Sequence, residues 1–595
     1  MRTISGLATA RGFAVGPVFV YRGGDDIPIP EYAVVPGAEV DELVRFRRAN
    51  MEAKRDLGGL IATLRERTGR SDIKIFECHM MLLEDSVLVG ETEKYILEDR
   101  VNAEAAVRRT AARSRAMFER MTDPYFRERV RDLDDVERRL LKKLLGFAAN
   151  PAFGLSRPSV IVADDLTPSE TVQLPRDLVL GFATNGGSAT SHVALLARSM
   201  GIPAVTGLGD ITSLVSPGDT VLLDGTAGTV TLSPDAAAIR DFRDLVERQK
   251  EISEEAITGA PAGTLHDGGE VLLYANLHPG APFDGVKDSG ARGVGLYRSE
   301  YLWLNDESEP SEEKQFDAYR SVAEFASTLS KNGQVTIRVL DIGGDKLVHG
   351  ISMSSDGRRR EANPFLGNRS IRYLLSNREI FKTQLRAILR ASAFGKVRLL
   401  YPMISCVDEL RASAEVLSQV RSALDAEGVA YDHDMEVGTM IEVPSAAINA
   451  ASLAKHVDFL SIGTNDLVQY TMAADRGNDS VSHLYQPTNP AVLKLMRHVV
   501  SVAKERGMKV AVCGESASDP IVGVLWAAMG IDELSMSATY IPVMSKLFSK
   551  LTRADLDDYL KTAEAAMEDA TADEILAVCR DWMERKIPDI ANIVI

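Results

Sequence analysis

The chain has 595 residues, more than a single hydrophobic core normally organises, so we expect three or four structural units. With 45% hydrophobic and 26% charged residues the composition is that of a globular protein, and no apolar stretch is long enough for a membrane span or a signal peptide. The net charge of −17 argues against nucleic acid as a partner, and the four dispersed cysteines (Cys78, Cys406, Cys513 and Cys579) argue against disulfides or a zinc site and favour a cytoplasmic location.

The first 233 residues predict a mixed α/β domain that is interrupted by a helical bundle. Strand-like sequence at 13–21 gives way near Pro36 to helical periodicity that lasts to about Phe147. Amphipathic helices are predicted over 40–65, 73–83, 86–99, 103–121 and 124–145, and strands over 159–163, 178–183, 204–206, 221–223 and 230–232. We therefore expect residues 1–30 and 150–233 to form one domain, with 31–149 inserted into it.

A glycine-rich turn lies between the strand-like run 178–183 and the helix-like run 193–198. Its sequence is Gly186-Gly187-Ser188-Ala189-Thr190-Ser191-His192. Free backbone N–H groups and the helix dipole at such a turn favour an anion and disfavour imidazolium. His192 is therefore a candidate neutral nucleophile for a phosphoryl group, although a lone histidine can equally be a hydrogen-bonded structural residue.

Residues 234–263 are predicted to connect this domain to the next one. A charged helical pattern at 235–256 is followed by Thr258-Gly259-Ala260-Pro261-Ala262-Gly263, which predicts a flexible joint. In 264–595, strand candidates alternate with helices, at 270–276, 293–298, 335–340, 397–403, 436–442, 457–463, 509–514 and 533–537. Eight such units over roughly 300 residues predict a (β/α)8 barrel, whose active site lies at the carboxyl ends of its strands.

The ends of these strands carry residues that predict an anion site. Four amide or cationic side chains are expected at one mouth: Arg298, Arg338, Asn465 and Arg476. Guanidinium groups match phosphate and carboxylate, although rim arginines are often only solvated charges. Arg338 interrupts an apolar strand, so it must be paired or functional. Glu442 and Asp466 would repel an anion unless a cation joined them, and Mg²⁺ suits carboxylate and substrate oxygens.

Cys513 ends the apolar strand Val510-Ala511-Val512. Most cysteines at strand ends only pack against their neighbours. Beside an anionic enol or carbonyl, however, a thiol can donate a proton to carbon. Cys513 is therefore a candidate acid at the barrel mouth.

Several longer motifs resemble one known family along nearly the whole chain. They are Asp165-Leu166-Thr167-Pro168-Ser169-Glu170-Thr171, Thr190-Ser191-His192, Gly293-Val294-Gly295-Leu296-Tyr297-Arg298-Ser299-Glu300, Asp341-Ile342-Gly343-Gly344-Asp345-Lys346, Asn363-Pro364-Phe365-Leu366-Gly367, Ser461-Ile462-Gly463-Thr464-Asn465-Asp466-Leu467 and Asp475-Arg476-Gly477-Asn478-Asp479. In these segments the chain is similar to Enzyme I of the bacterial sugar phosphotransferase system, the phosphoenolpyruvate-protein phosphotransferases.

The resemblance implies a role for each matching residue. His192 would be phosphorylated by phosphoenolpyruvate, Glu442 and Asp466 would bind Mg²⁺, and Cys513 would be the acid/base on carbon as pyruvate forms. Phosphoenolpyruvate would be bound by Arg298, Arg338, Asn465 and Arg476, with Lys346 and Arg369 as further contributors. Thr171 matches the threonine that hydrogen-bonds the active histidine. The helical insertion would dock the small histidine phosphocarrier protein HPr, which receives the phosphoryl group, and the barrel would form a homodimer.

One motif departs from the family pattern, and three different functions stay open. The family reads Gly-Gly-Arg-Thr-Ser-His, whereas Ser188 and Ala189 precede Thr190 here. A dikinase or synthase that makes phosphoenolpyruvate would share the histidine domain and the barrel, but it needs a nucleotide-binding domain for which we find no P-loop pattern. A catalytically silent scaffold is the second possibility, and a nitrogen-regulatory paralogue is the third.

Overall fold

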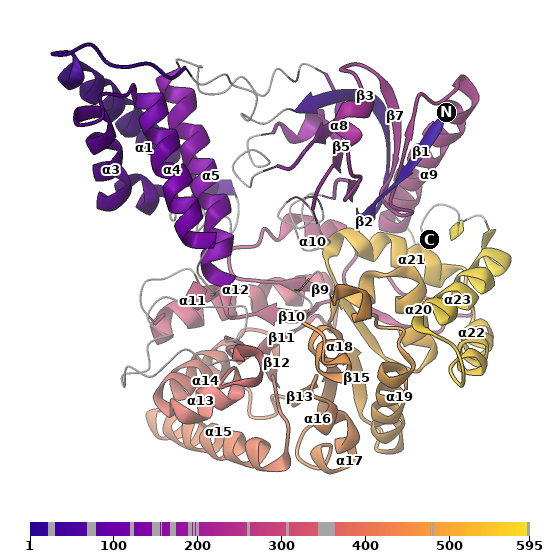
Figure 1. The fold of residues 1–595 in the computed structure, drawn as a ribbon. Helices are drawn as coiled ribbons and strands as arrows, with labels where there is room; N and C mark the ends of the chain where they lie inside the picture. The colour runs from indigo at the N-terminus through magenta and orange to yellow at the C-terminus, as the bar shows by residue number, and fades with distance from the viewer. Residues whose placement is uncertain are drawn as a thin grey trace. The chain divides into compact units, whose positions relative to one another are not determined.

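The computed structural model describes the following parts of the chain: 1–21, 30–67, 79–119, 124–145, 155, 157–166, 174–187, 193, 197, 201–258, 262–304, 309–342, 363–475, 478, 481–588 and 590–591. These residues form two compact units, Met1–Val246 and Glu247–Ile595. The first contains a helical bundle and a mixed sheet, and the second contains a closed barrel (Figure 1). The predicted α/β fold class with a barrel in the C-terminal part is therefore confirmed.

Four long helices build the bundle of the first unit: α1 (Glu39–Arg67), α3 (Ser86–Leu97), α4 (Ala103–Glu119) and α5 (Pro124–Leu144). Residues 79–84 are also helical, whereas 73–78 of the predicted helix 73–83 lie outside the described residues. Apolar side chains at helical spacing, such as Phe46, Ala49, Ala53 and Leu57 of α1, face one shared core. Burial of this stripe is what holds the helices together.

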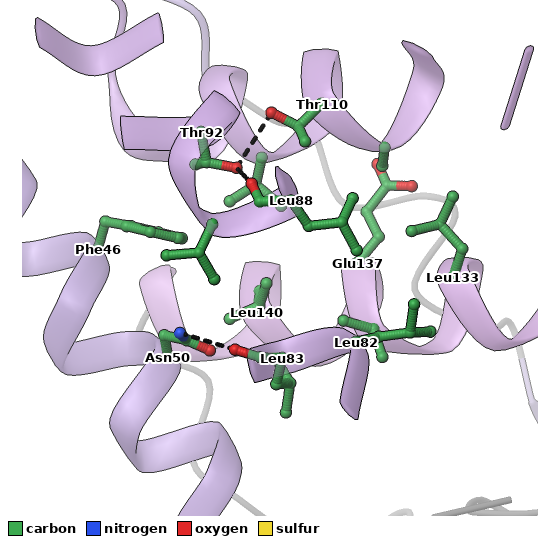
Figure 2. A pocket seen from close by; sticks show the side chains of 14 residues that line it. Phe46, Asn50, Leu82, Leu83, Leu88, Thr92, Thr110, Leu133, Glu137 and Leu140 are labelled. Atoms are coloured by element: carbon green, nitrogen blue, oxygen red, sulfur yellow. Dashed lines mark hydrogen bonds between the residues drawn. The ribbon is translucent and has the colours of Figure 1, made fainter. Parts of the chain in front are cut away.

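A small cavity lies inside the bundle, between α1, α3, α4 and α5 (Figure 2). Leucine and valine dominate its lining, and Asn50, Thr92, Thr110 and Glu137 are its polar members. Asn50 Nδ2 donates to the carbonyl oxygen of Leu83 over 3.2 Å, and the Thr92 and Thr110 hydroxyls lie 3.0 Å apart. The volume of about 30 Å³ accommodates about two water molecules, which is too little for a metabolite.

The eight strands of the first unit form one sheet in the order β1-β8-β7-β3-β4-β5-β6-β2. Their bounds are β1 Arg2–Ser5, β2 Leu7–Ala10, β3 Phe13–Tyr21, β4 Ser159–Ala163, β5 Val179–Thr184, β6 Ala204–Thr206, β7 Thr220–Asp224 and β8 Thr229–Leu232. The segment from β3 through β4 and β5 to β6 is parallel, and the other pairs are antiparallel. Alternate residues of β4 enter two different cores, which is the pattern of a central strand covered on both faces.

Strands β1 and β2 were not predicted from the sequence. They occupy opposite ends of the strand order, yet only Gly6 separates them in the chain. The Gly6 N–H donates to the carbonyl oxygen of Gly228 over 2.8 Å, and a Cβ at Gly6 would collide with the carbonyl oxygen of Thr206. The two edges of the sheet are thus joined through the chain itself. Beyond the sheet lie η2 (Arg176–Leu178), α8 (Ile211–Leu214) and the connecting helix α9 (Ala236–Thr258).

The second unit is a closed barrel of eight parallel strands in the order β9 to β16 (Figure 1). Their bounds are β9 Leu272–Leu277, β10 Val294–Arg298, β11 Gln334–Arg338, β12 Lys396–Tyr401, β13 Val437–Ile441, β14 Phe459–Ile462, β15 Lys509–Val512 and β16 Glu533–Met536. All eight predicted barrel strands are therefore present. Closure removes the sheet edges and gathers the carboxyl ends of all strands at one mouth.

Helices follow the barrel strands and cover them. They are α10 Asp284–Asp288, α11 Tyr301–Leu304, α12 Glu312–Leu329, η3 Pro364–Leu366, α13 Ile371–Ser376, α14 Arg378–Ser392, α15 Val407–Glu427, α16 Pro444–Ile448, α17 Ala450–Leu453, α18 Thr464–Met472, η4 Ser482–Leu484, α19 Pro490–Glu505, η5 Glu515–Ser518, α20 Pro520–Ala528, η6 Ala538–Tyr540, α21 Ile541–Ser549, α22 Arg553–Ala566 and α23 Ala572–Lys586. Among the described helices, none combines the length and apolarity that crossing a bilayer requires.

Candidate active site

The residues predicted for the mouth follow directly from where the strands end. Arg298 and Arg338 are the last residues of β10 and β11, and they are register partners. Glu442 follows β13, Asp466 lies in the first turn of α18 just after β14, and Cys513 follows β15. Since the strands are parallel and the barrel is closed, these five positions share one end of the barrel.

Arg338 is buried at the mouth and held by two carboxylates. Its Nη2 lies 2.7 Å from Glu300 Oε1, and its Nη1 lies 2.9 Å from Asp341 Oδ2. The Ser299 hydroxyl donates to the backbone carbonyl oxygen of Arg338 over 2.6 Å. The Nε–H of Arg338 is buried, and no described group accepts a hydrogen bond from it. Arg338 is therefore paired, which is one of the two alternatives expected for a charge in this strand, and its Nε–H is without an acceptor among the described residues.

Arg369, which follows η3, lies beside Arg338 and shares one of its carboxylates. Its Nη2 donates to Asp341 Oδ1 over 3.0 Å, and its Nη1 lies 3.4 Å from Asp466 Oδ1. The same Nη1 lies 3.1 Å from the hydroxyl of Tyr470, which donates to the carbonyl oxygen of Phe365 over 2.6 Å. Its Nε–H is a second buried donor without an acceptor in the described part of the chain.

Glu442 is a buried carboxylate, only 1% exposed. The backbone N–H of Met403 donates to Glu442 Oε1 over 2.5 Å, and Met403 has a φ of 55°. A Cβ at Gly463 would lie 2.8 Å from Glu442 Oε2, so any side chain there would have to displace this carboxylate. Burial raises the pKa of this carboxyl well above its usual range, and the negative charges of Asp466 and Asp341 raise it further.

The two carboxylates Glu442 and Asp466 therefore lie in a site where a cation is favourable. Burial and the neighbouring charge of Asp466 make the ionised form of Glu442 costly, and a bound cation would relieve both effects. The described residues contain no group of three or more histidine, cysteine or acidic side chains that could hold a metal ion by themselves. A metal here would thus need oxygens from a ligand or water, which is how Mg²⁺ is commonly bound.

Cys513 is 3% exposed and packs against Leu296, Leu400, Met440 and Phe459 inside the barrel. Burial raises the pKa of its thiol, so the thiol keeps its proton near neutral pH. Cys513 is therefore a buried, protonated thiol at the end of β15.

Asn465 lies next to these groups at the start of α18. Its Oδ1 accepts from the backbone N–H of Glu515 over 3.2 Å, and the Tyr485 hydroxyl donates to its carbonyl oxygen over 3.1 Å. The side-chain NH₂ group of Asn465 is its remaining donor for a ligand at the mouth.

Four predicted site residues lie outside the described residues: Thr171, His192, Lys346 and Arg476. The segment that leads toward His192 is described up to Gly187 and is well anchored. Thr212 Oγ1 donates to Asp164 Oδ1 over 2.8 Å and accepts from Asn185 Nδ2 over 2.7 Å. The N–H of Gly186 donates to the carbonyl oxygen of Asp164 over 3.1 Å. The turn therefore starts from the carboxyl ends of β4 and β5.

Glu300, Tyr470 and Ser461 contact the predicted site residues directly, although none of them was predicted from the sequence to have a role. Glu300 had a detectable signal, because a buried strand arginine needs a carboxylate and Glu300 follows the neighbouring strand. No sequence signal indicated a role for Tyr470 or Ser461, since a tyrosine in a helix and a serine in a strand fit many environments.

Three family models match the chain. The model for the N-terminal part of PEP-utilising enzymes matches residues 5–129, that for their mobile domain 155–228, and that for their PEP-binding domain 253–553. Phosphoenolpyruvate-protein phosphotransferase of Bacillus sp. (strain S) is 41% identical over 586 residues, which cover 97% of each chain. The Haemophilus influenzae protein of that name is 39% identical and covers 98% of this chain and 99% of its own. A solution structure of Enzyme I (nEIt) is 34% identical, covers 42% of this chain and 99% of its own, and has a TM-score of 0.37.

Proposed function

The chain belongs to the phosphoenolpyruvate-protein phosphotransferases, and on that premise we propose how its residues divide the reaction between them. Phosphoenolpyruvate binds at the barrel mouth, its phosphoryl group passes to His192, and pyruvate leaves. Phospho-His192 then passes the group to a histidine of the phosphocarrier protein HPr. The observation that carries this proposal is the pair of buried arginines, Arg338 and Arg369, each with an Nε–H that has no acceptor among the described residues.

The arginines bind the substrate anion. Phosphoenolpyruvate carries a phosphate and a carboxylate, and guanidinium donors match both groups. Arg338 and Arg369 are fixed by Glu300, Asp341 and Asp466, so they need little reorganisation when substrate arrives. The remaining proposed contacts come from Arg298, Asn465, Arg476 and Lys346.

Glu442 and Asp466 would hold Mg²⁺, which supplies charge neutralisation on substrate oxygens when bound. The burial of both side chains and the raised pKa of Glu442 beside Asp466 support this assignment. Neutral His192 attacks phosphorus, with Thr171 as its hydrogen-bond partner, and the arginine charges stabilise the transferring group. The Cys513 thiol gives its proton to the carbon of the enolate, and pyruvate is formed.

The division into domains is part of the same proposal. Residues 1–30 and 150–233 carry His192, residues 31–149 dock HPr, and residues 264–595 bind phosphoenolpyruvate and form a homodimer. Helix α9 supports a connecting role for 234–263. Because donor and acceptor bind to different domains, this connector acts as a hinge.

The test is phosphorylation of the full chain with labelled phosphoenolpyruvate and Mg²⁺. The wild-type chain and a His456→Ala control, which alters an exposed histidine, should acquire an acid-labile, alkali-stable label and release pyruvate. His192→Ala should acquire none, and unlabelled HPr should discharge the wild-type label. Persistent acid-labile label in His192→Ala contradicts the assignment, and labelling that requires a nucleotide would favour a dikinase.

A further inference from the structure

The hydroxyl of Ser461 lies inside the barrel, next to Cys513. Ser461 is on β14 and Cys513 follows β15, and the two strands are hydrogen-bonded neighbours. Ser461 Oγ donates to Cys513 Sγ over 3.5 Å, and Sγ lies 3.8 Å from the carbonyl oxygen of Ile462. Ser461 is 1% exposed and Cys513 is 3% exposed, so both groups are withdrawn from solvent.

The hydrogen bond from Ser461 to Cys513 is weak while the thiol is neutral. A buried hydroxyl that loses water needs a good acceptor, and thiol sulfur is a weak one. Within the described part of the chain, Sγ is the hydrogen-bond partner found for the Ser461 hydroxyl. The same contact becomes strong once the sulfur is a thiolate, because a hydrogen bond to a charged acceptor is about twice as strong as a neutral one. The interaction therefore favours the charged form of Cys513 over its neutral form.

Other groups act on the sulfur in the same step. The guanidinium charges of Arg338 and Arg298 favour a thiolate, whereas the Glu442 carboxylate disfavours it. These charges act through their electrostatic field, while Ser461 supplies a directed donor. Asn276 Nδ2 lies 3.3 Å from the backbone carbonyl of Cys513 and holds the main chain rather than the sulfur.

We propose that Ser461 is a positioning residue that orients the Cys513 sulfur and stabilises the thiolate formed when Cys513 protonates the enolate. The inference rests on the proposed role of Cys513. In this step the S–H bond breaks, a C–H bond forms at the methylene carbon of the enolate, and the electron pair of the S–H bond stays on sulfur. A solvent-derived acid, hydronium or protonated buffer, restores the thiol before the next turnover.

Stabilisation limited to the charged form has a specific kinetic consequence. It lowers the barrier to proton transfer and leaves substrate binding unchanged, because the neutral thiol gains little from the hydrogen bond. Ser461→Ala should therefore slow proton exchange at carbon by about tenfold, since a hydrogen bond to a charged group contributes on that scale. The KM for phosphoenolpyruvate and the extent of His192 labelling should change less than about twofold.

The experiment follows exchange of the pyruvate methyl protons with D₂O by NMR, using the full chain with Mg²⁺ and pyruvate. This reaction is the reverse of enolate protonation, so it reports proton transfer without phosphoryl transfer. Five proteins are compared: wild type, Ser461→Ala, Ser461→Thr, Thr439→Val and Cys513→Ala. Ser461→Thr keeps the hydroxyl and should restore most of the exchange. Thr439→Val removes a buried hydroxyl from the neighbouring strand β13 and should exchange like wild type.

The outcomes separate this inference from the proposed function. Wild-type exchange in Ser461→Ala, together with lost exchange in Cys513→Ala, overturns the role of Ser461 alone. Full exchange in Cys513→Ala overturns the role of Cys513 itself. If Ser461→Ala and Thr439→Val lose exchange equally, the effect is structural and the proposal fails. The pH dependence of Cys513 alkylation gives a second readout, because without the Ser461 donor the alkylation curve should move to higher pH.

Discussion

In the barrel, eight parallel strands bring their carboxyl ends to one mouth, whereas the sheet of the first unit mixes parallel and antiparallel strands. The mouth therefore gathers charged residues that are up to 166 positions apart in the chain, from Glu300 to Asp466, and fixes them through shared buried ion pairs. At the described ends of β4 and β5, Asp164, Asn185 and Thr212 are joined by hydrogen bonds instead of buried ion pairs, and the proposed nucleophile, His192, comes from the segment after β5. Parallel closure thus favours a site made of many cooperating groups, and a mixed sheet favours a site made by one loop.

The largest expected effect comes from Arg369→Met. It leaves Asp341 and Asp466 buried without one of their cations, and breaking such a pair costs about 3–5 kcal/mol. In calorimetry the unfolding temperature of the barrel should fall, while that of the first unit should stay unchanged. The rate of His192 labelling should fall by about 10²–10³-fold. The matched control is Arg372→Met, which alters a partly exposed arginine in α13. It should change neither the unfolding temperature of the barrel nor the rate of His192 labelling. Equal shifts of both transitions would show that the two regions are not independent.

The second effect concerns Glu442→Gln and depends on pH. The folded-state pKa of Glu442 is raised, so between the unfolded value of about 4.3 and the folded value the native chain holds a proton that the unfolded chain has lost. The contribution of Glu442 to the free energy of unfolding is therefore fully present at low pH, and it is lost as the pH rises through the folded-state pKa of Glu442. Without metal, Glu442→Gln should therefore unfold at a higher temperature than wild type at pH 8, with little difference at pH 5.

Addition of Mg²⁺ extends the Glu442→Gln experiment. It should raise the Tm of the wild-type barrel transition and leave that of Glu442→Gln unchanged. The transition of the first unit should not respond to Mg²⁺ in either protein. A pH-independent difference between the two proteins at low and high pH would contradict the buried-carboxylate explanation.

A third, smaller effect compares one glycine from each region. In Gly463→Ala the new Cβ lies 2.8 Å from Glu442 Oε2, and in Gly181→Ala it lies 3.2 Å from the carbonyl oxygen of Pro203. Each substitution should lower the free energy of unfolding by about 1–3 kcal/mol, because the added methyl group overpacks the interior. Only Gly463→Ala should also weaken the Mg²⁺-dependent rise in Tm and the rate of His192 labelling. A loss of labelling in folded Gly181→Ala would mean that the interior of the sheet shapes the reaction as strongly as the mouth does.

The smallest effect is the reactivity of Cys513 toward iodoacetamide. Burial keeps its thiol protonated, as it does for Cys579, whose pKa it raises to about 11. Peptide mapping after short exposure at pH 7.5 should show Cys406, which is partly exposed, alkylated well before either. Alkylation of Cys513 as fast as Cys406 would mean that the interior of the barrel is open to solvent.

Much of the barrel could be predicted from the sequence because its signal is local. Each strand is a short apolar run that ends in a polar residue, and the ends of parallel strands must meet. Sequence also indicated that Arg338 is paired or functional, but it could not give both partners, since Glu300 and Asp341 follow different strands. Ion pairing across strands depends on register, which a linear pattern does not contain.

The sheet was harder to predict for the same reason. Strands β1 and β2 have four residues each, most of them exposed in β1, so they lack an apolar period. Their partners β8 and β6 lie about 200 residues further along the chain, and that pairing is what makes them strands. The roles of His192, Thr171, Lys346 and Arg476 stay predictions, because these residues lie outside the described part of the structure.

The junction at Gly6 has a consequence for how the chain is made. Strands β1 and β2 leave the ribosome well before their partners at 229–232 and 204–206, which are among the last three strands of the sheet to be synthesised. At a translation rate of about 5–20 residues per second, this leaves an interval of roughly 10–50 seconds in which both borders of the sheet are exposed to other nascent chains. A bulky fusion before β1 would lie beside the strand that must still pair with β8 and would hinder that pairing sterically, so such a fusion should lower the yield of folded protein more than the same fusion after residue 595.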